Sequence, residues 1–128
     1  MESANKALIE LARETIRDRY EPGRHDVGAA LRTDAGTTYV GVHLGTSVGR
    51  IAVCAEAVVL AVAVMSGDSA IDTIVAVRHD GTVVPPCGMC RELIYDYSPG
   101  ARVIVADTPA VRLEEISALL PFKGDSLG

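Results

Sequence analysis

Residues 51–65 read IAVCAEAVVLAVAVM, the most apolar stretch of the chain, and residues 71–77 follow as IDTIVAV. The first stretch is too short to span a bilayer and carries Glu56 near its middle, so we expect a buried helix over residues 54–65. The second is an almost continuous apolar run, typical of a strand that is buried on both faces. This order of elements indicates an α/β fold in which part of the sheet is parallel.

The flanking segments extend this order of elements. Apolar residues recur every three or four positions over residues 3–19, which predicts an amphipathic helix. Two β-branched runs flank a turn at residues 33–36, which predicts a hairpin. The other expected elements are the hairpin strands at 27–31 and 37–42, a helix at 87–96, a strand at 102–106 and a last helix at 111–120.

The chain has 128 residues, 48% of them hydrophobic, and a net charge of −5. This length fits one domain over residues 1–128. An acidic balance argues against binding to a nucleic-acid polymer, which requires a positive surface to neutralise phosphates. The N-terminal stretch is charged throughout and lacks the apolar region of a signal peptide, so we expect a cytoplasmic protein without membrane attachment.

The expected helix at residues 54–65 is apolar around its whole circumference from Ala57 onward. Such a helix requires burial on every side, and one sheet covers only one of them. Either the other helices of the chain cover the rest, or a neighbouring subunit does. The complete apolar ring favours a homo-oligomer.

Three cysteines lie in two short motifs, CAE at residues 54–56 and PCGMC at residues 86–90. Each motif lies at an expected helix start, where the helix dipole favours the thiolate, the form that binds zinc. Cys54, Cys87 and Cys90 would leave the fourth tetrahedral position open for water, which is the arrangement of a catalytic zinc (Zn²⁺) site.

Glu56 follows the first cysteine by two positions and lies within an apolar run. Burial there would raise the pKa of its carboxyl and suit it to proton transfer near neutral pH. The spacing therefore predicts metal-assisted hydrolysis with Glu56 as the catalytic proton shuttle. The alternative is a carboxylate that only accepts hydrogen bonds from the helix N-terminus.

The cysteine motifs also admit interpretations without catalysis. PCGMC at a helix start is similar to a thioredoxin-type redox motif, although this leaves residues 54–56 unexplained. A structural zinc site would need a fourth protein ligand, which one of the three histidines could supply. Either interpretation would make the chain a zinc or thiol binding module rather than an enzyme.

The two motifs together resemble the signature of the zinc deaminases, in which the glutamate is not a ligand. The chain resembles the small three-cysteine cytidine deaminases over roughly residues 5–122. Residues 54–60 and 86–92 are also similar to the blasticidin S deaminase branch of that family. Further agreement lies in residues 27–31, in Arg91 and in residues 119–122.

The resemblance implies a three-layer fold, with a five-stranded mixed sheet flanked by helices, and a homotetramer with sites at subunit junctions. It also implies a role in pyrimidine salvage, with the C4 amine of a free cytosine nucleoside converted to a carbonyl and ammonia released. Zinc would activate the attacking water, and Glu56 would move the protons. A blasticidin S-type aminoacylnucleoside or another aminopyrimidine is the alternative substrate.

The resemblance places the substrate against the backbone N–H of Ala55 and against Val27, His43, Gly45 and Phe122. His43 and Gly45 stand where cytidine deaminases carry the asparagine and glutamate that hold the ribose. A site without that glutamate should discriminate poorly on the sugar hydroxyl, so the sugar or substituent stays open.

Two further positions differ from the family pattern. Ala57 replaces an arginine that many members carry directly after the glutamate, and His25 replaces an aromatic residue two positions before Val27. We expect His25 to lie on the surface, and His43 to be either a solvated loop residue or a ligand contact.

Overall fold

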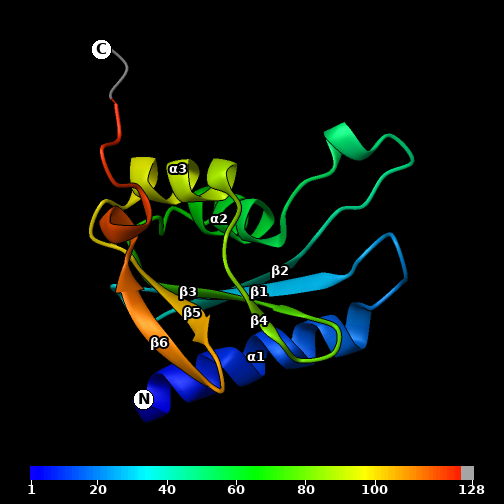
Figure 1. Ribbon diagram of the computed structural model, residues 1–128, viewed down its shortest axis with the longest axis horizontal. Helices are drawn as coiled ribbons and strands as arrows, with labels where there is room; N and C mark the ends of the chain where they lie inside the picture. The colour runs from blue at the N-terminus through cyan, green and yellow to red at the C-terminus, as the bar shows by residue number, and fades with distance from the viewer. Residues whose placement is uncertain (125–128) are drawn as a thin grey trace.

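The structure is a computed structural model that describes residues 1–124, with a mixed sheet between two helical layers (Figure 1). Its elements in chain order are α1 (Ser3–Arg19), β1 (Val27–Thr33), β2 (Thr38–Val42), η1 (Gly49–Ile51), α2 (Ala55–Met65), β3 (Ile71–Arg78), β4 (Val83–Val84), α3 (Gly88–Tyr97), β5 (Arg102–Asp107), β6 (Ala110–Glu115) and η2 (Ile116–Leu119). The two η elements are short 3-10 helices.

The sheet follows the order β2-β1-β3-β5-β6, and the two-residue strand β4 pairs with β3 beside this path. β3 and β5 run parallel, while the other pairs are antiparallel. A parallel pair requires a crossover connection, and α3 lies in the one that joins these two strands. The expected five-stranded mixed sheet between helices is confirmed, with β4 as a short addition that was not predicted.

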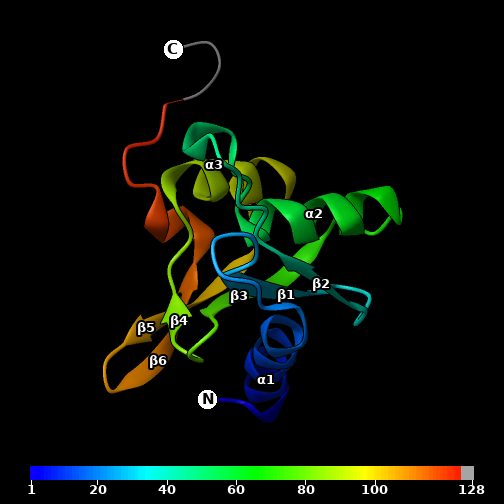
Figure 2. The ribbon, with the colours of Figure 1, turned by 90° about the vertical axis from the view of Figure 1, so that its right-hand side faces the viewer.

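Two hydrophobic cores fill the space between the three layers. α1 packs on one face of the sheet, and α2 and α3 pack on the other (Figures 1 and 2). Alternate residues of β1 serve the two cores, because Ala29 and Leu31 are buried with α2 whereas Ala30 is buried with α1. β3 is buried on both faces in the same way, as its apolar pattern predicts.

The helix predicted over residues 111–120 is wrong, because the chain forms β6 and η2 there. The turn at residues 108–109 returns the chain alongside β5, and six residue pairs join the two strands. Val111 and Leu113 point to the α1 core, while the residues before and between them are exposed. The free edge of β5 supplies partners for the backbone, and this outweighs a weak helical pattern.

α2 has nearly the predicted bounds, and the other helices do not cover it completely. Val59, Leu60 and Ala63 are buried, whereas the outer side of the helix is exposed and includes Met65, with 89% of its surface accessible. Within residues 1–124, no helix has both the length and the apolar character needed to cross a membrane.

Glycines let the helices approach the sheet closely on both faces. A Cβ atom at Gly28 of β1 would lie 2.8 Å from the Ala12 carbonyl oxygen of α1. A Cβ atom at Gly41 of β2 would lie 2.8 Å from the backbone nitrogen of Val59 in α2. The second contact sets the height of α2 above the sheet, and with it the position of the residues at the start of that helix.

Replacing Gly41 by alanine should lower the free energy of unfolding by about 1–3 kcal/mol, because the new Cβ meets backbone that moves only if α2 moves. Gly100→Ala is the matched control, since a Cβ atom there meets nothing within 4 Å. Urea unfolding of the purified protein measures the stability of both variants. Equal stability of the two would contradict the close contact between β2 and α2.

Candidate active site and metal centre

Three cysteines from two helix starts meet above one end of the sheet. Cys54 directly precedes α2, Cys87 directly precedes α3, and Cys90 is buried in the first turn of α3. Their Sγ atoms all lie within 4.8 Å of one another, and those of Cys54 and Cys87 are 3.4 Å apart. No other group of three or more His, Cys, Asp or Glu side chains in residues 1–124 forms such a cluster.

Backbone pairing fixes the position of Cys54. Leu44 and Val53 exchange hydrogen bonds of 2.9 and 3.0 Å, which ties the residue before Cys54 to the loop after β2. The Cys54 carbonyl accepts the Val58 N–H and so begins the hydrogen-bond ladder of α2. The thiol is therefore held from both sides along the chain.

The cluster has the dimensions of a zinc site. Zinc binds thiolate at about 2.3 Å, so two thiolates of a tetrahedral site lie roughly 3.8 Å apart. The 3.4 Å between the Sγ atoms of Cys54 and Cys87 and the upper bound of 4.8 Å for all three pairs bracket that value. Because Cys54 joins the other two cysteines, the site is more than a two-cysteine redox motif. Within the described residues no histidine joins the cluster, so the fourth tetrahedral position is left for water.

The three thiols differ in how readily they ionise. Burial raises the pKa of Cys54 and of Cys90, and the hydrogen bond to the Cys87 thiol raises that of Cys54 further. Burial acts on Cys87 in the same direction, but hydrogen bonds from backbone N–H groups of α3 and from the other thiols outweigh it and lower its pKa. All three can ionise together only with a cation between them, which zinc would provide.

Glu56 is the second residue of α2, and only 6% of its surface is accessible. It packs among apolar residues of β3, β4 and α3, including Ile74, Val84 and Ile94. Burial raises the pKa of the Glu56 carboxyl, although its own backbone N–H opposes the shift. No Lys, Arg or His in residues 1–124 forms an ion pair with it, so this carboxyl can hold a proton and release it.

The structure brings Val27, His43 and Ala55 to the same end of the sheet as the cysteines. The His43 N–H donates to the Val27 carbonyl at 2.9 Å, where β1 begins and β2 has just ended. The residue after His43 is Leu44, whose partner Val53 adjoins Cys54. Ala55 is buried, and as the first residue of α2 its N–H has no partner within the helix.

Two histidines are joined at the rim of this end of the sheet. His25 Nδ1–H donates to the His43 carbonyl at 2.8 Å, and His43 Nδ1 accepts the Asp26 N–H at 3.1 Å. The second bond places the proton of His43 on Nε2, while a neutral His25 keeps Nε2 as an acceptor. Both residues are half-buried, so His25 is not the surface residue that the sequence led us to expect.

Gly45 is buried against the loop that precedes β1. Its N–H donates to the Arg24 carbonyl at 2.7 Å, and a Cβ atom built on it would lie 1.8 Å from the Gly23 carbonyl oxygen. No side chain fits at this position unless both loops move. Gly45 can therefore contact a substrate through its backbone alone.

The Phe122 side chain, which the resemblance assigns to substrate binding, faces solvent. It follows η2 on the C-terminal segment, and its side chain is fully exposed. The next residue, Lys123, pairs with Glu92 of α3 at 2.8 Å and lies over the Tyr95 ring. The segment is thus held against α3 with the Phe122 ring facing solvent.

Residues 2–106 match the model of the family described as the cytidine and deoxycytidylate deaminase zinc-binding region. The blasticidin-S deaminase of Bacillus cereus is 44% identical over 124 residues, which cover 91% of this chain and 89% of that protein. A cytidine deaminase of Halalkalibacterium halodurans is 31% identical over 117 residues, covering 89% of each chain. The crystal structure of cytidine deaminase from Burkholderia pseudomallei superposes with a TM-score of 0.79 at 28% identity, covering 97% of this chain and all of that one.

The purified protein should carry about one zinc per chain, and Cys87→Ala should lose most of it because two thiols hold the metal weakly. Met89→Ala is the control, since this exposed side chain lies between two of the cysteines in sequence. Atomic absorption of dialysed protein gives the zinc content, and thermal unfolding reports the accompanying loss of stability. Full zinc retention by Cys87→Ala would show that the metal binds elsewhere.

Proposed function

As a member of the cytidine and deoxycytidylate deaminase family the chain is a zinc-dependent deaminase, and we propose that its substrate is a free cytosine nucleoside or a close analogue. The observation that carries this proposal is the cluster of three cysteines beside the buried carboxyl of Glu56. The acidic net charge of −5 supports a free nucleoside over a nucleic-acid strand.

In the proposed reaction, Cys54, Cys87 and Cys90 would hold zinc, which would supply an activated water near neutral pH. Glu56 takes a proton from the attacking water and delivers it to ring nitrogen N3. Attack of the water oxygen on C4 leaves a hydroxyl there, and the same carboxyl then moves the hydroxyl proton to the C4 amine, which departs as ammonia and leaves a carbonyl. The Ala55 N–H binds the base. Burial of Glu56, with no ion-pair partner among residues 1–124, supports its role, because burial raises the pKa of the carboxyl and so favours its taking up a proton.

At the sugar end, the proposed substrate meets imidazole and backbone groups of His43 and Gly45, where cytidine deaminases carry an asparagine and a glutamate. His43 offers its Nε2–H as a donor, and His25 offers Nε2 as an acceptor. Val27 and the backbone of Gly45 complete this side. A hydroxyl or another small polar group that both donates and accepts a hydrogen bond would suit the two histidines together.

A blasticidin S-type aminoacylnucleoside is the second candidate substrate. The chain is 44% identical to the blasticidin-S deaminase of Bacillus cereus, against 29% and 31% for two cytidine deaminases. The packed glycine at position 45 and the apolar Ala57 also depart from the cytidine deaminase pattern.

A spectrophotometric screen of cytidine, deoxycytidine, cytosine and blasticidin S tests the substrate. We expect turnover of at least one nucleoside with release of ammonia, and the order of kcat/KM decides between the two candidates. Glu56→Gln should keep its zinc but lose at least about 100-fold in kcat, because the proton carrier is gone. No turnover of any compound by the zinc-loaded protein would contradict the proposed substrate class, and turnover by Glu56→Gln would contradict the proton shuttle.

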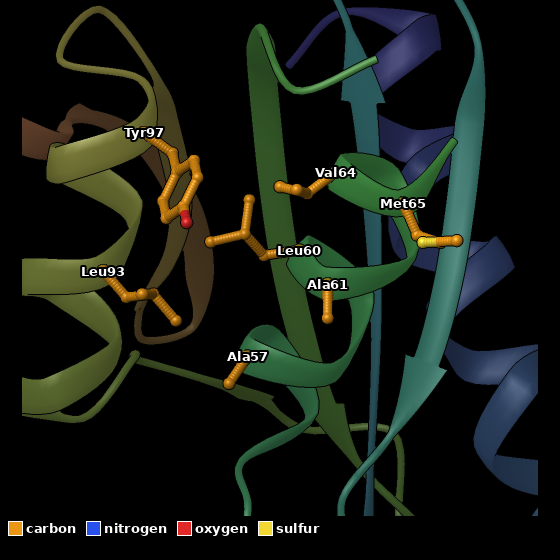
Figure 3. Close-up of a pocket in the computed structure, with 7 residues that line it drawn as sticks. All are labelled: Ala57, Leu60, Ala61, Val64, Met65, Leu93 and Tyr97. Carbon is orange, nitrogen blue, oxygen red and sulfur yellow. The ribbon is translucent and has the colours of Figure 1, made fainter. Parts of the chain in front are cut away.

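We also propose that the chain assembles as a homotetramer, through the exposed side of α2. Figure 3 shows small and apolar side chains of α2 that line a groove opposite Leu93 and Tyr97 of α3. A second apolar groove lies between α2 and the Leu44–Val53 pair. Neither groove is lined by a charged residue, so a second copy would bury them without removing charges from water. The exposed Phe122 would then reach the site of a neighbouring subunit.

Ala61 lines both grooves, so Ala61→Glu should separate the subunits by placing a charge in the proposed interface. Ala7→Glu is the matched control, because this exposed residue lies on α1, across the sheet. Sedimentation velocity at micromolar concentration should give an oligomer for the parent protein and for Ala7→Glu, and a smaller species for Ala61→Glu. A monomeric parent protein would contradict the assembly, and an oligomeric Ala61→Glu would contradict the interface.

We propose that residues 1–128 form one catalytic domain that acts in the cytoplasm, with a role in pyrimidine salvage. All three cysteines are free thiols, which suits a reducing compartment. One continuous sheet runs from β2 to β6, which supports a single domain.

A further inference from the structure

The segment that carries Cys87 has few backbone donors with which to fix itself. Pro85 and Pro86 come directly before Cys87, and neither has an N–H. Cys87 is exposed, whereas Cys90 is buried within α3. The carbonyl groups of this segment are therefore the main hydrogen-bonding groups through which the rest of the chain can fix its position.

Arg91 binds two consecutive carbonyl groups of the segment. Its backbone N–H donates to the Cys87 carbonyl at 2.9 Å, and its side-chain Nε–H donates to the Pro86 carbonyl, also at 2.9 Å. With both carbonyls held, the peptide group between Pro86 and Cys87 has a fixed orientation. That orientation decides where the Cys87 Cβ, and with it the thiol, points.

The same guanidinium makes a second hydrogen bond, here called the second arm, which leads away from the cysteines. Its Nη1 donates to the Leu119 carbonyl at 3.4 Å, a long hydrogen bond to the end of η2. The neighbouring Glu92 holds Lys123 of the same C-terminal segment. The two arms are chemically separable, because each uses a different nitrogen of Arg91.

We propose that Arg91 is a positioning residue for zinc binding, and that it acts through the Nε–H bond to the Pro86 carbonyl. The guanidinium charge and the Nη1 arm to the C-terminal segment add little to zinc affinity. This role concerns the metal site alone, so it stands whichever nucleoside the enzyme prefers. Outer partners that orient metal ligands commonly change metal affinity or activity by about 10- to 100-fold.

Two substitutions separate the hydrogen bond from the charge. Glutamine carries its amide nitrogen on Cδ, where arginine carries Nε, so Arg91→Gln keeps a donor at the same atom but loses the charge. Arg91→Lys keeps the charge but places its nitrogen one atom further out. We expect Arg91→Gln to bind zinc within about threefold of the parent protein and Arg91→Lys to lose roughly tenfold or more. Competition with a chromophoric chelator measures both affinities without substrate.

Lys123→Met is the control for the attachment of the C-terminal segment, because it removes the ion pair to Glu92 and leaves the Arg91 bond to the Pro86 carbonyl untouched. Its zinc affinity should equal that of the parent protein. Cobalt(II) in place of zinc gives a second reading, since the thiolate charge-transfer band should weaken in Arg91→Lys and persist in Arg91→Gln. Tighter zinc binding by Arg91→Lys than by Arg91→Gln, or a loss in Lys123→Met equal to that in Arg91→Lys, would overturn the proposal.

Discussion

Three thiols whose Sγ atoms lie within 4.8 Å of one another can ionise together only with a cation between them, and the buried Glu56 carboxyl lies in the first turn of the helix that follows Cys54. Cys54 and Cys87 begin two helices that approach each other above one end of the sheet, with Sγ atoms 3.4 Å apart. Each helix start also lends its N–H groups to this region. The rest of the fold positions these two helix starts. The close contact at Gly41 sets the distance of α2 from the sheet, and the crossover from β3 to β5 places α3 beside α2.

The metal centre was largely predictable because its chemistry is local in sequence. The spacing of Cys87 and Cys90 corresponds to one turn of helix, and Glu56 lies in the first turn of the helix that directly follows Cys54. The buried strand at residues 71–78 was visible because apolar side chains must fill both faces of a central strand. Such features depend on residues that are close together in the sequence, so the sequence alone predicts them.

The features that were missed depend on contacts between distant segments. β6 forms because β5 has a free edge beside it, and the weak periodicity of residues 111–120 does not reveal that edge. The bond from His25 to the His43 carbonyl joins two loops that are 18 residues apart. Nothing in the sequence around His25 signals that its ring supports another histidine. The apolar residues around the whole of α2 did indicate that its own chain would leave part of the helix exposed. That feature could be read from composition alone, without knowing which segments pair.

The backbone contact between Gly23 and Gly45 constrains how this enzyme can acquire a new specificity. The fold cannot accommodate an acidic residue at position 45 as a single substitution, because even the Cβ of alanine would lie 1.8 Å from the Gly23 carbonyl oxygen. The loop at residues 20–26 would first have to shorten or take another path. A shift in specificity at this position therefore requires coordinated changes in two segments, and laboratory evolution by point mutation would be directed instead to the two histidines of the rim.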